Sequence, residues 1–181
     1  MNKAILPAGS GALKLVSAAL LLLAVLIFAA GCADPADNGP ARATPRAGDL
    51  APDFELLSVD GETVRLSQFR GESYVLLRFT ATWCPPCRAQ TPRLKELHEK
   101  YGERGLTIVS VNTGEPLETV RAYVEEEDTR YITLVDADNV IAPLYGVRFI
   151  PLNMIIEKSG HLHSEPSSAL PEEAIAELLE Q

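Results

Sequence analysis

The sequence has few residues that bind metal ions. Three cysteines and three histidines occur in 181 residues, at positions Cys32, Cys84, Cys87, His98, His161 and His163. A structural zinc ion normally needs four Cys or His ligands in regularly spaced pairs, and only Cys84 and Cys87 have that spacing. The shortage excludes a zinc knuckle, and we expect neither a metal centre nor another cofactor.

Basic residues are also scarce relative to acidic ones. Lys and Arg number 16 against 25 Asp and Glu, which gives a formal net charge of −9. Because an acidic surface repels phosphate groups, we expect no nucleic-acid partner. The apolar content of 46% is ordinary for a globular protein, and the length suits one folded domain with additional segments.

One long uncharged run, residues 15–31, follows Lys3 and Lys14. It falls just short of the ~20 residues of a membrane span and exceeds the ~7–15 residues of a typical signal-peptide core. It ends in Ala29-Ala30-Gly31-Cys32, which resembles the bacterial lipobox, although that motif more often has Leu at the position of Ala29. Residues 1–31 are therefore interpreted as a lipoprotein signal peptide whose removal leaves Cys32 lipidated, or alternatively as an uncleaved anchor. Both alternatives place the rest of the chain outside the cytoplasm and tethered to a membrane.

The remaining residues divide into a tether and a folded domain. Residues 32–48 are rich in Pro, Gly and Ala, which predicts a flexible tether. In residues 49–181, strands are predicted at 51–57, 62–66, 74–79, 106–111, 131–135, 152–157 and 160–164, and helices at 67–69, 85–104, 116–127, 139–145 and 171–180. The first two strands form a hairpin at Asp60-Gly61, and the last two form another. This order predicts an α/β sandwich with a mixed central sheet flanked by helices and an extra N-terminal β-hairpin.

The chemistry is predicted at Trp83-Cys84-Pro85-Pro86-Cys87, between a predicted strand and the helix that follows. Two cysteines separated by two residues form either a redox dithiol or half of a zinc site, and the missing ligands favour the dithiol. A helix N-terminus favours the thiolate, so Cys84 is the predicted nucleophile. Cys87 lies one turn later and is predicted to resolve the mixed disulfide. Pro85 suits the first helical position because no hydrogen bond is lost there.

Five motifs occur in order along residues 49–181. They are Ala51-Pro52-Asp53-Phe54, Leu66-Ser67-Gln68-Phe69-Arg70-Gly71, Ala81-Thr82-Trp83-Cys84-Pro85-Pro86-Cys87, Pro92 and Ile150-Pro151. The set resembles the membrane-tethered thioredoxin-fold oxidoreductases of the TlpA/ResA type, which are related to the redoxin and AhpC/TSA proteins. The resemblance implies a three-layer thioredoxin-like sandwich with a redox-active Cys84–Cys87 disulfide. It also implies that Ile150-Pro151 is a cis-proline loop which, with Trp83, Pro85 and Pro86, supports substrate binding; the family often has Thr at the next position, where this chain has Leu152.

Two positions depart from the family pattern and are candidate modulators of the cysteine pKa values. Thioredoxins carry a buried Asp six residues before the first cysteine, where this chain has Arg78. ResA-like members often carry Glu three residues after the second cysteine, where this chain has Gln90. We expect Arg78 to be an ordinary charge, paired at the sheet edge or extending into solvent. The alternative is that it lies beneath the site and stabilises a thiolate.

The predicted function is that of an extracytoplasmic, membrane-anchored bacterial thiol-disulfide oxidoreductase acting on cysteine-containing protein substrates. The resemblance implies a reductant that is supplied by a membrane electron donor of the DsbD/CcdA type and acts on apocytochrome c or copper-site proteins. Two alternatives stay open. A peroxiredoxin-like peroxidase normally has Thr and Pro where this chain has Ala81 and Leu77. A copper-binding or metallochaperone module would use Cys84, Cys87 and a histidine.

Overall fold

The computed structural model describes residues 44–180. The predicted signal peptide or anchor, the lipidation site Cys32 and most of the predicted tether lie outside these residues. Among residues 44–180, no helix is long and apolar enough to cross a membrane.

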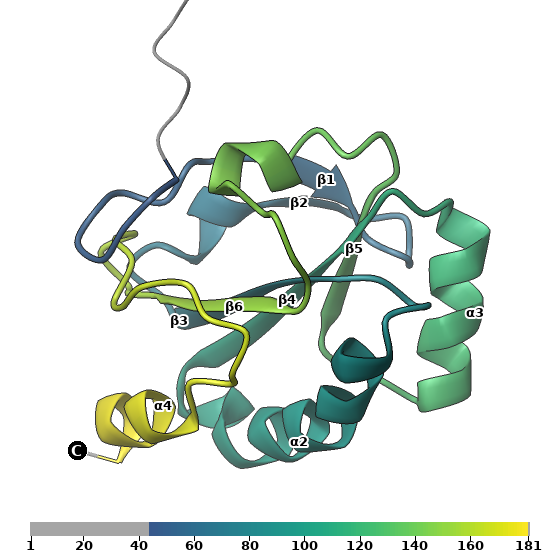
Figure 1. The fold of residues 1–181 in the computed structure, drawn as a ribbon. Coiled ribbons are helices and arrows are strands. Elements are labelled where there is room, and N and C mark those ends of the chain that lie inside the picture. The colour runs from purple at the N-terminus through teal and green to yellow at the C-terminus, as the bar shows by residue number, and fades with distance from the viewer. Residues whose placement is uncertain (1–43, 181) are drawn as a thin grey trace, which may run out of the picture. The chain divides into compact units, whose positions relative to one another are not determined.

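A four-stranded mixed sheet with the strand order β5-β4-β3-β6 forms the centre of these residues (Figure 1). Its strands are β3 (Tyr74–Thr80), β4 (Leu106–Thr113), β5 (Ile132–Asp136) and β6 (Leu152–Ile156). Strand β4 pairs in parallel with both β3 and β5, whereas β6 is antiparallel to β3. Parallel neighbours need a crossover connection, and helices α2 (Pro85–Tyr101) and α3 (Leu117–Glu127) supply the two crossovers.

The two faces of the sheet are covered differently (Figure 1). Helix α2 and the C-terminal helix α4 (Glu172–Leu179) lie along one face, and α3 adjoins α2 there, where the hydroxyl oxygens of Thr91 and Tyr123 are 2.9 Å apart. The other face is covered by the hairpin of β1 (Glu55–Leu57) and β2 (Thr63–Arg65) and by the 3-10 helices η1 (Leu66–Phe69) and η3 (Ala142–Tyr145). Strand β3 contributes to both cores, with Val75, Leu77 and Phe79 on the hairpin side and Leu76 on the helix side. A strand covered on both faces is normally apolar throughout, and Arg78 interrupts that pattern.

The predicted mixed sheet, its flanking helices and the N-terminal hairpin are confirmed, and two predicted elements differ. The helix predicted at 139–145 is reduced to η3, because the Asp136 carboxylate accepts the backbone N–H groups of Val140, Ile141 and Ala142 and holds the preceding loop open. The strand predicted at 160–164 is wrong. The predicted antiparallel pairing with the end of β6 is present only as the isolated bridge between Ile156 and Leu162, and a second bridge joins His161 to Leu50, so no regular strand forms there.

The motif Ala51-Pro52-Asp53-Phe54 attaches the N-terminal segment to the 3-10 helices η1 and η3. Asp53 accepts the backbone N–H of Ser67 at 2.9 Å and its hydroxyl at 2.8 Å, and the Pro52 carbonyl accepts the Tyr145 hydroxyl at 2.5 Å. Burial raises the pKa of the Asp53 carboxyl, but the hydrogen bonds from Ser67 and the Phe54 backbone, together with the charge of Arg70, outweigh that effect, and the pKa lies below its ordinary value.

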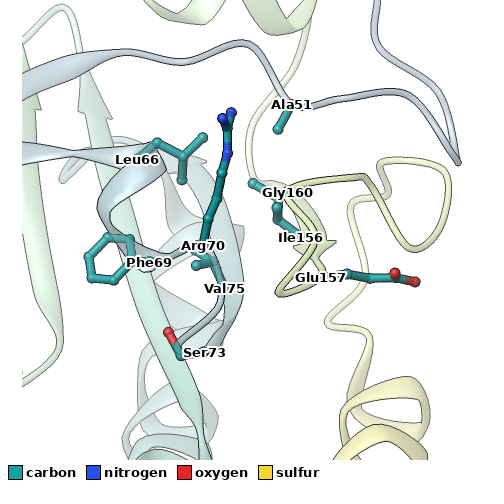
Figure 2. Close-up of a pocket in the computed structure, with 9 residues that line it drawn as sticks. All are labelled: Ala51, Leu66, Phe69, Arg70, Ser73, Val75, Ile156, Glu157 and Gly160. Atoms are coloured by element: carbon teal, nitrogen blue, oxygen red, sulfur yellow. The ribbon is translucent and has the colours of Figure 1, made fainter.

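A small hollow lies between η1, the start of β3 and the end of β6, and Figure 2 shows the residues that line it. The Arg70 side chain stands between Leu66 on one side and Ala51 and Gly160 on the other. A side chain at Gly160 would place its Cβ 2.7 Å from Arg70 Nε, in a backbone conformation with φ of +89° that favours glycine. The space is about 10 Å³, which suits at most one water molecule, so the hollow is not a substrate site.

Replacing Asp53 with Ala should lower the free energy of unfolding at pH 7 by about 1 kcal/mol, because the Ser67 hydrogen bonds are lost. The folded pKa of Asp53 is lowered, so the stabilisation is present above the unfolded pKa of about 4 and disappears as the pH falls through the folded value. Urea unfolding of wild type and Asp53→Ala at pH 7 and at pH 3 measures this. The exposed Glu62→Ala variant is the control and should differ from wild type by less than about 0.5 kcal/mol. An Asp53→Ala deficit of equal size at both pH values would contradict the role of the ionised carboxylate.

Candidate active site

Cys84 and Cys87 form a disulfide at the beginning of α2. Cys84 is the N-cap residue, and its Sγ accepts the backbone N–H of Cys87 at 3.3 Å. Pro85 and Pro86 occupy the first two helical positions, where a missing N–H breaks no helical hydrogen bond. The Cys84 sulfur therefore lies at the positive end of the helix dipole. This environment favours a thiolate at Cys84 once the disulfide is reduced.

The loop before β6 lies against the cysteine pair. The Ile150–Pro151 peptide bond is cis, as the resemblance implies. The Ile150 carbonyl oxygen is 3.8 Å from Cys84 Sγ. The Ile150 side chain packs against the cluster of Ala81, Cys84 and Cys87. The two segments meet because β6 is antiparallel to β3, so that the start of β6 lies beside the end of β3, with Leu152 opposite Phe79.

A groove of about 500 Å³ opens beside Cys84. It is lined by Trp83, Cys84, Pro85, Pro86, Thr113, Asn139, Ala142, Val147, Arg148, Phe149 and Ile150. Trp83 is 68% exposed and Phe149 is 55% exposed, whereas Cys84 is 2% exposed. Exposed apolar groups gathered in one place mark an interaction surface, and a partner must enter this groove to reach the sulfur. Of the predicted support residues, Pro151 is buried and does not line the groove.

Arg78 lies beneath the site, and the expectation of a surface charge is wrong. The side chain is 1% exposed. Its Nη2 donates to Thr80 Oγ1 at 3.2 Å and to the Cys87 carbonyl oxygen at 3.4 Å. The reason is that β3 is an inner strand with β4 and β6 on either side, so Arg78 has no sheet edge to reach, and α2 covers the face on which it stands. Burial lowers the pKa of the Arg78 guanidinium, and the phenols of Tyr131 and Tyr123 oppose that shift.

Gln90 is half-buried one turn of α2 beyond Cys87. Its Nε2 donates to the Ser168 carbonyl at 2.8 Å, and its Oε1 accepts from Asn153 Nδ2 at 3.3 Å. These contacts attach α2 to β6 and to the segment before α4, and an influence of Gln90 on the cysteine pKa values stays a prediction. In residues 44–180 there is no group of three or more His, Cys, Asp or Glu side chains that could hold a metal ion.

Sequence reasoning missed Glu115. This side chain is 5% exposed, and its carboxylate accepts both the backbone N–H of Thr82 at 2.7 Å and the Thr82 hydroxyl at 2.5 Å. Thr82 lies two residues before Cys84, so Glu115 holds the loop that presents the cysteine. An acidic residue two positions after the end of β4 was the available signal, because the carboxyl ends of the parallel strands β3 and β4 lie at the same edge of the sheet.

Replacing Glu115 with Ala should lower the free energy of unfolding by about 1–3 kcal/mol, because the half-buried Thr82 loses the partner of its N–H and of its hydroxyl. The amide hydrogen of Thr82 should also exchange faster. Urea unfolding and amide hydrogen exchange measure the two effects. The control is Glu118→Ala, which removes an exposed carboxylate that pairs with Arg121 and should change stability by less than about 0.5 kcal/mol. Equal stability losses in the two variants would show that the buried contact is unimportant.

Comparison with known proteins agrees with this geometry. The model of the AhpC/TSA family matches residues 47–164. The thiol-disulfide oxidoreductase ResA of Halalkalibacterium halodurans is 30% identical over 161 residues, which cover 89% of this chain and 91% of that protein. ResA of Geobacillus kaustophilus is 33% identical over 133 residues, covering 74% of this chain and 76% of the relative. A solved thiol:disulfide interchange protein of the thioredoxin family from Chlorobium tepidum has a TM-score of 0.64 at 25% identity, over 73% of this chain and 96% of that one.

The family match, the relatives and the fold therefore lead to one assignment. The cysteine pair at the N-terminus of α2 is the group that would carry out thiol-disulfide exchange. The chain belongs to the AhpC/TSA family and, within it, to the ResA-like thiol-disulfide oxidoreductases with a thioredoxin-like fold.

Proposed function

We propose that this oxidoreductase reduces disulfides of other proteins outside the cytoplasm, with Cys84 as the nucleophile and Cys87 as the resolving cysteine. The observation that supports these roles is the position of Cys84. Its sulfur caps α2 and lies 3.8 Å from the Ile150 carbonyl, and Cys84 lines the groove, whereas Cys87 does not.

The proposed reaction begins with the reduced dithiol. The Cys84 thiolate attacks one sulfur of a substrate disulfide, so that a Cys84–substrate bond forms, the substrate S–S bond breaks and the released substrate thiolate takes a proton from solvent. The Cys87 thiolate then attacks Cys84 Sγ, which forms the Cys84–Cys87 disulfide and releases the second substrate thiolate. The substrate has gained two electrons and the protein has lost two. A membrane electron donor of the DsbD/CcdA type then restores the dithiol.

The proposed place of this reaction is the outer side of a bacterial membrane. The support comes from the sequence, in which the apolar residues 15–31 precede Cys32 in a lipobox-like context. The proposed substrates are apocytochrome c and proteins that contain copper sites. This choice rests on the resemblance to TlpA/ResA proteins, while the need for a cysteine pair in the partner follows from the reaction itself.

The proposed partner docks as a segment that inserts a cysteine beside Ile150. Trp83 and Phe149 flank the groove with exposed aromatic surface, and the neighbouring backbone carbonyl of Ile150 offers a hydrogen-bond acceptor to the incoming chain. Aromatic side chains in such positions often dominate binding energies.

The Cys87→Ser variant tests the assigned roles, because without Cys87 the mixed disulfide at Cys84 cannot be resolved. It should accumulate disulfide-linked partners in the membrane fraction of cells, visible by non-reducing electrophoresis and identified by mass spectrometry. Cys84→Ser is the matched control and should accumulate none. Partners trapped by Cys84→Ser alone would reverse the two roles, and partners drawn only from the cytoplasm would contradict the proposed location.

Replacing Phe149 with Ser in the Cys87→Ser background should reduce the amount of trapped partner about fivefold, as expected for loss of an aromatic contact worth about 1 kcal/mol. Quantitative mass spectrometry of the mixed disulfides measures the reduction. Leu57→Ser is the control, because Leu57 is 54% exposed on β1 and does not line the groove; it should trap as much as its parent. Undiminished trapping by Phe149→Ser would exclude this surface as the docking site.

A further inference from the structure

Arg78 is a buried cation without an acidic partner. None of the salt bridges among residues 44–180 includes it, and its Nε has no hydrogen-bond partner there. With 1% exposure the side chain also has almost no access to water. A buried charge is costly unless it is paired. An anion that forms beside Arg78 during the reaction would therefore be stabilised strongly.

Within residues 44–180, the groups that bond to Arg78 or act on its charge include no carboxylate. Strand β3 contributes Thr80, and helix α2 contributes the backbone carbonyl of Cys87. The titratable neighbours from the other packed elements are the phenols of Tyr131 and Tyr123, and β6 places Asn153 opposite Arg78 in the sheet. On the outer side of α2 and α3, Arg88 pairs with Glu126 and Glu127 at 3.6 and 3.0 Å, at the surface.

Cys87 is the neighbour that can become an anion at neutral pH. Burial raises the pKa of Tyr131, so this phenol stays protonated. Reduction of the disulfide, in contrast, generates a thiol at Cys87, which is 1% exposed and belongs to the residue whose carbonyl oxygen lies 3.4 Å from the guanidinium. The Cys84 sulfur has a different source of stabilisation, because it caps the helix.

We propose that Arg78 is the counter-ion of the Cys87 thiolate in the reduced enzyme and acts as a positioning residue for the resolving step. This proposal rests on the proposed function, in which Cys87 resolves the mixed disulfide. Burial alone would keep the Cys87 thiol protonated. An opposite charge within about 4–6 Å acts in the other direction and lowers a pKa by about 1–3 units.

Two consequences follow for the redox reaction. The disulfide takes up two electrons, and Cys87 retains its negative charge instead of binding a proton, so the resolving attack on Cys84 Sγ needs no nearby base. This accounts for a site that has Arg78 and Gln90 where related proteins have acids. The Cys84–Cys87 disulfide is also easier to reduce with Arg78 present, because the cation stabilises the reduced form only.

The first test titrates Cys87 in the full chain carrying Cys84→Ser, with and without Arg78→Met. The alkylation rate of Cys87 is followed against pH by mass spectrometry, which separates its peptide from that of Cys32. Arg78→Met should raise the Cys87 pKa by one unit or more, seen as a shift of the alkylation midpoint to higher pH, and Arg78→Lys should reverse most of that shift. Arg88→Met removes a cation one residue from Cys87 that is already paired, and should change the thiolate fraction less than threefold. If Arg78→Met does not fold, as judged by circular dichroism, Arg78→Gln carries the same expectation.

The second test measures the Cys84–Cys87 equilibrium against glutathione in chains that retain both cysteines. Arg78→Met should shift the equilibrium at least tenfold toward the disulfide, which corresponds to about 30 mV for a two-electron couple. An unchanged Cys87 pKa in a folded neutral variant, or an equilibrium shifted toward the dithiol, would overturn the proposal. Trapping by Cys87→Ser does not depend on Arg78. If Cys87→Ser traps partners normally but Arg78→Met leaves the Cys87 pKa unchanged, only the counter-ion role of Arg78 is refuted. If Cys87→Ser traps no partner but Arg78→Met raises the Cys87 pKa, only the proposed function is refuted.

Discussion

The position of strand β3 inside the sheet is the constraint on which the rest of the site depends. β3 is paired on both edges and covered on both faces. Its parallel pairing with β4 brings the carboxyl ends of both strands to one edge of the sheet, where Cys84 and Glu115 follow. Its antiparallel pairing with β6 brings the start of β6, and hence Ile150-Pro151, to the same edge. Three segments that are distant in the sequence therefore meet because of how one strand is paired.

The helix side of the sheet changes character along β3. Near its start, Leu76 packs with Leu94 and Leu97 of α2 in an apolar core. Toward the cysteines the same face carries Arg78 and Thr80, and their partners in the sheet are Ser110, Asn112 and Asn153, all buried and all polar. Burying polar groups costs stability unless they are paired, so this half of the interface stabilises the fold less than an apolar one would. The beginning of α2 therefore packs on a part of the sheet that is polar and carries the positive charge of Arg78.

The two cysteines consequently have different environments although they lie one helical turn apart. Cys84 faces the groove and caps α2, where its Sγ accepts the backbone N–H of Cys87. Cys87 is buried, and its carbonyl oxygen lies 3.4 Å from a guanidinium that water does not screen. In the proposed reaction this difference separates the two steps: the sulfur that meets the substrate is stabilised by the helix end, and the sulfur that resolves the intermediate is stabilised by a side chain of the sheet. Both arrangements stabilise a thiolate without a carboxylate base.

Local signals in the sequence determined the elements that depend on neighbouring residues alone. The alternation of apolar runs and helical periods located every strand of the central sheet, and Asp60-Gly61 located the hairpin turn. The two cysteines on either side of Pro85-Pro86 located the redox site. The sequence did not determine what covers each side chain. Arg78 was expected in solvent because an arginine usually is, and only the docking of α2 across β3 buries it. Glu115 was missed because its partner Thr82 is 33 residues away. The segment 160–164 pairs with two other segments only through isolated bridges, a length of pairing that its own residues do not determine. The sequence by itself therefore determined the thiol chemistry and its helix-end position, while tertiary structure decided the charge and the burial around each sulfur, because those depend on contacts between distant segments.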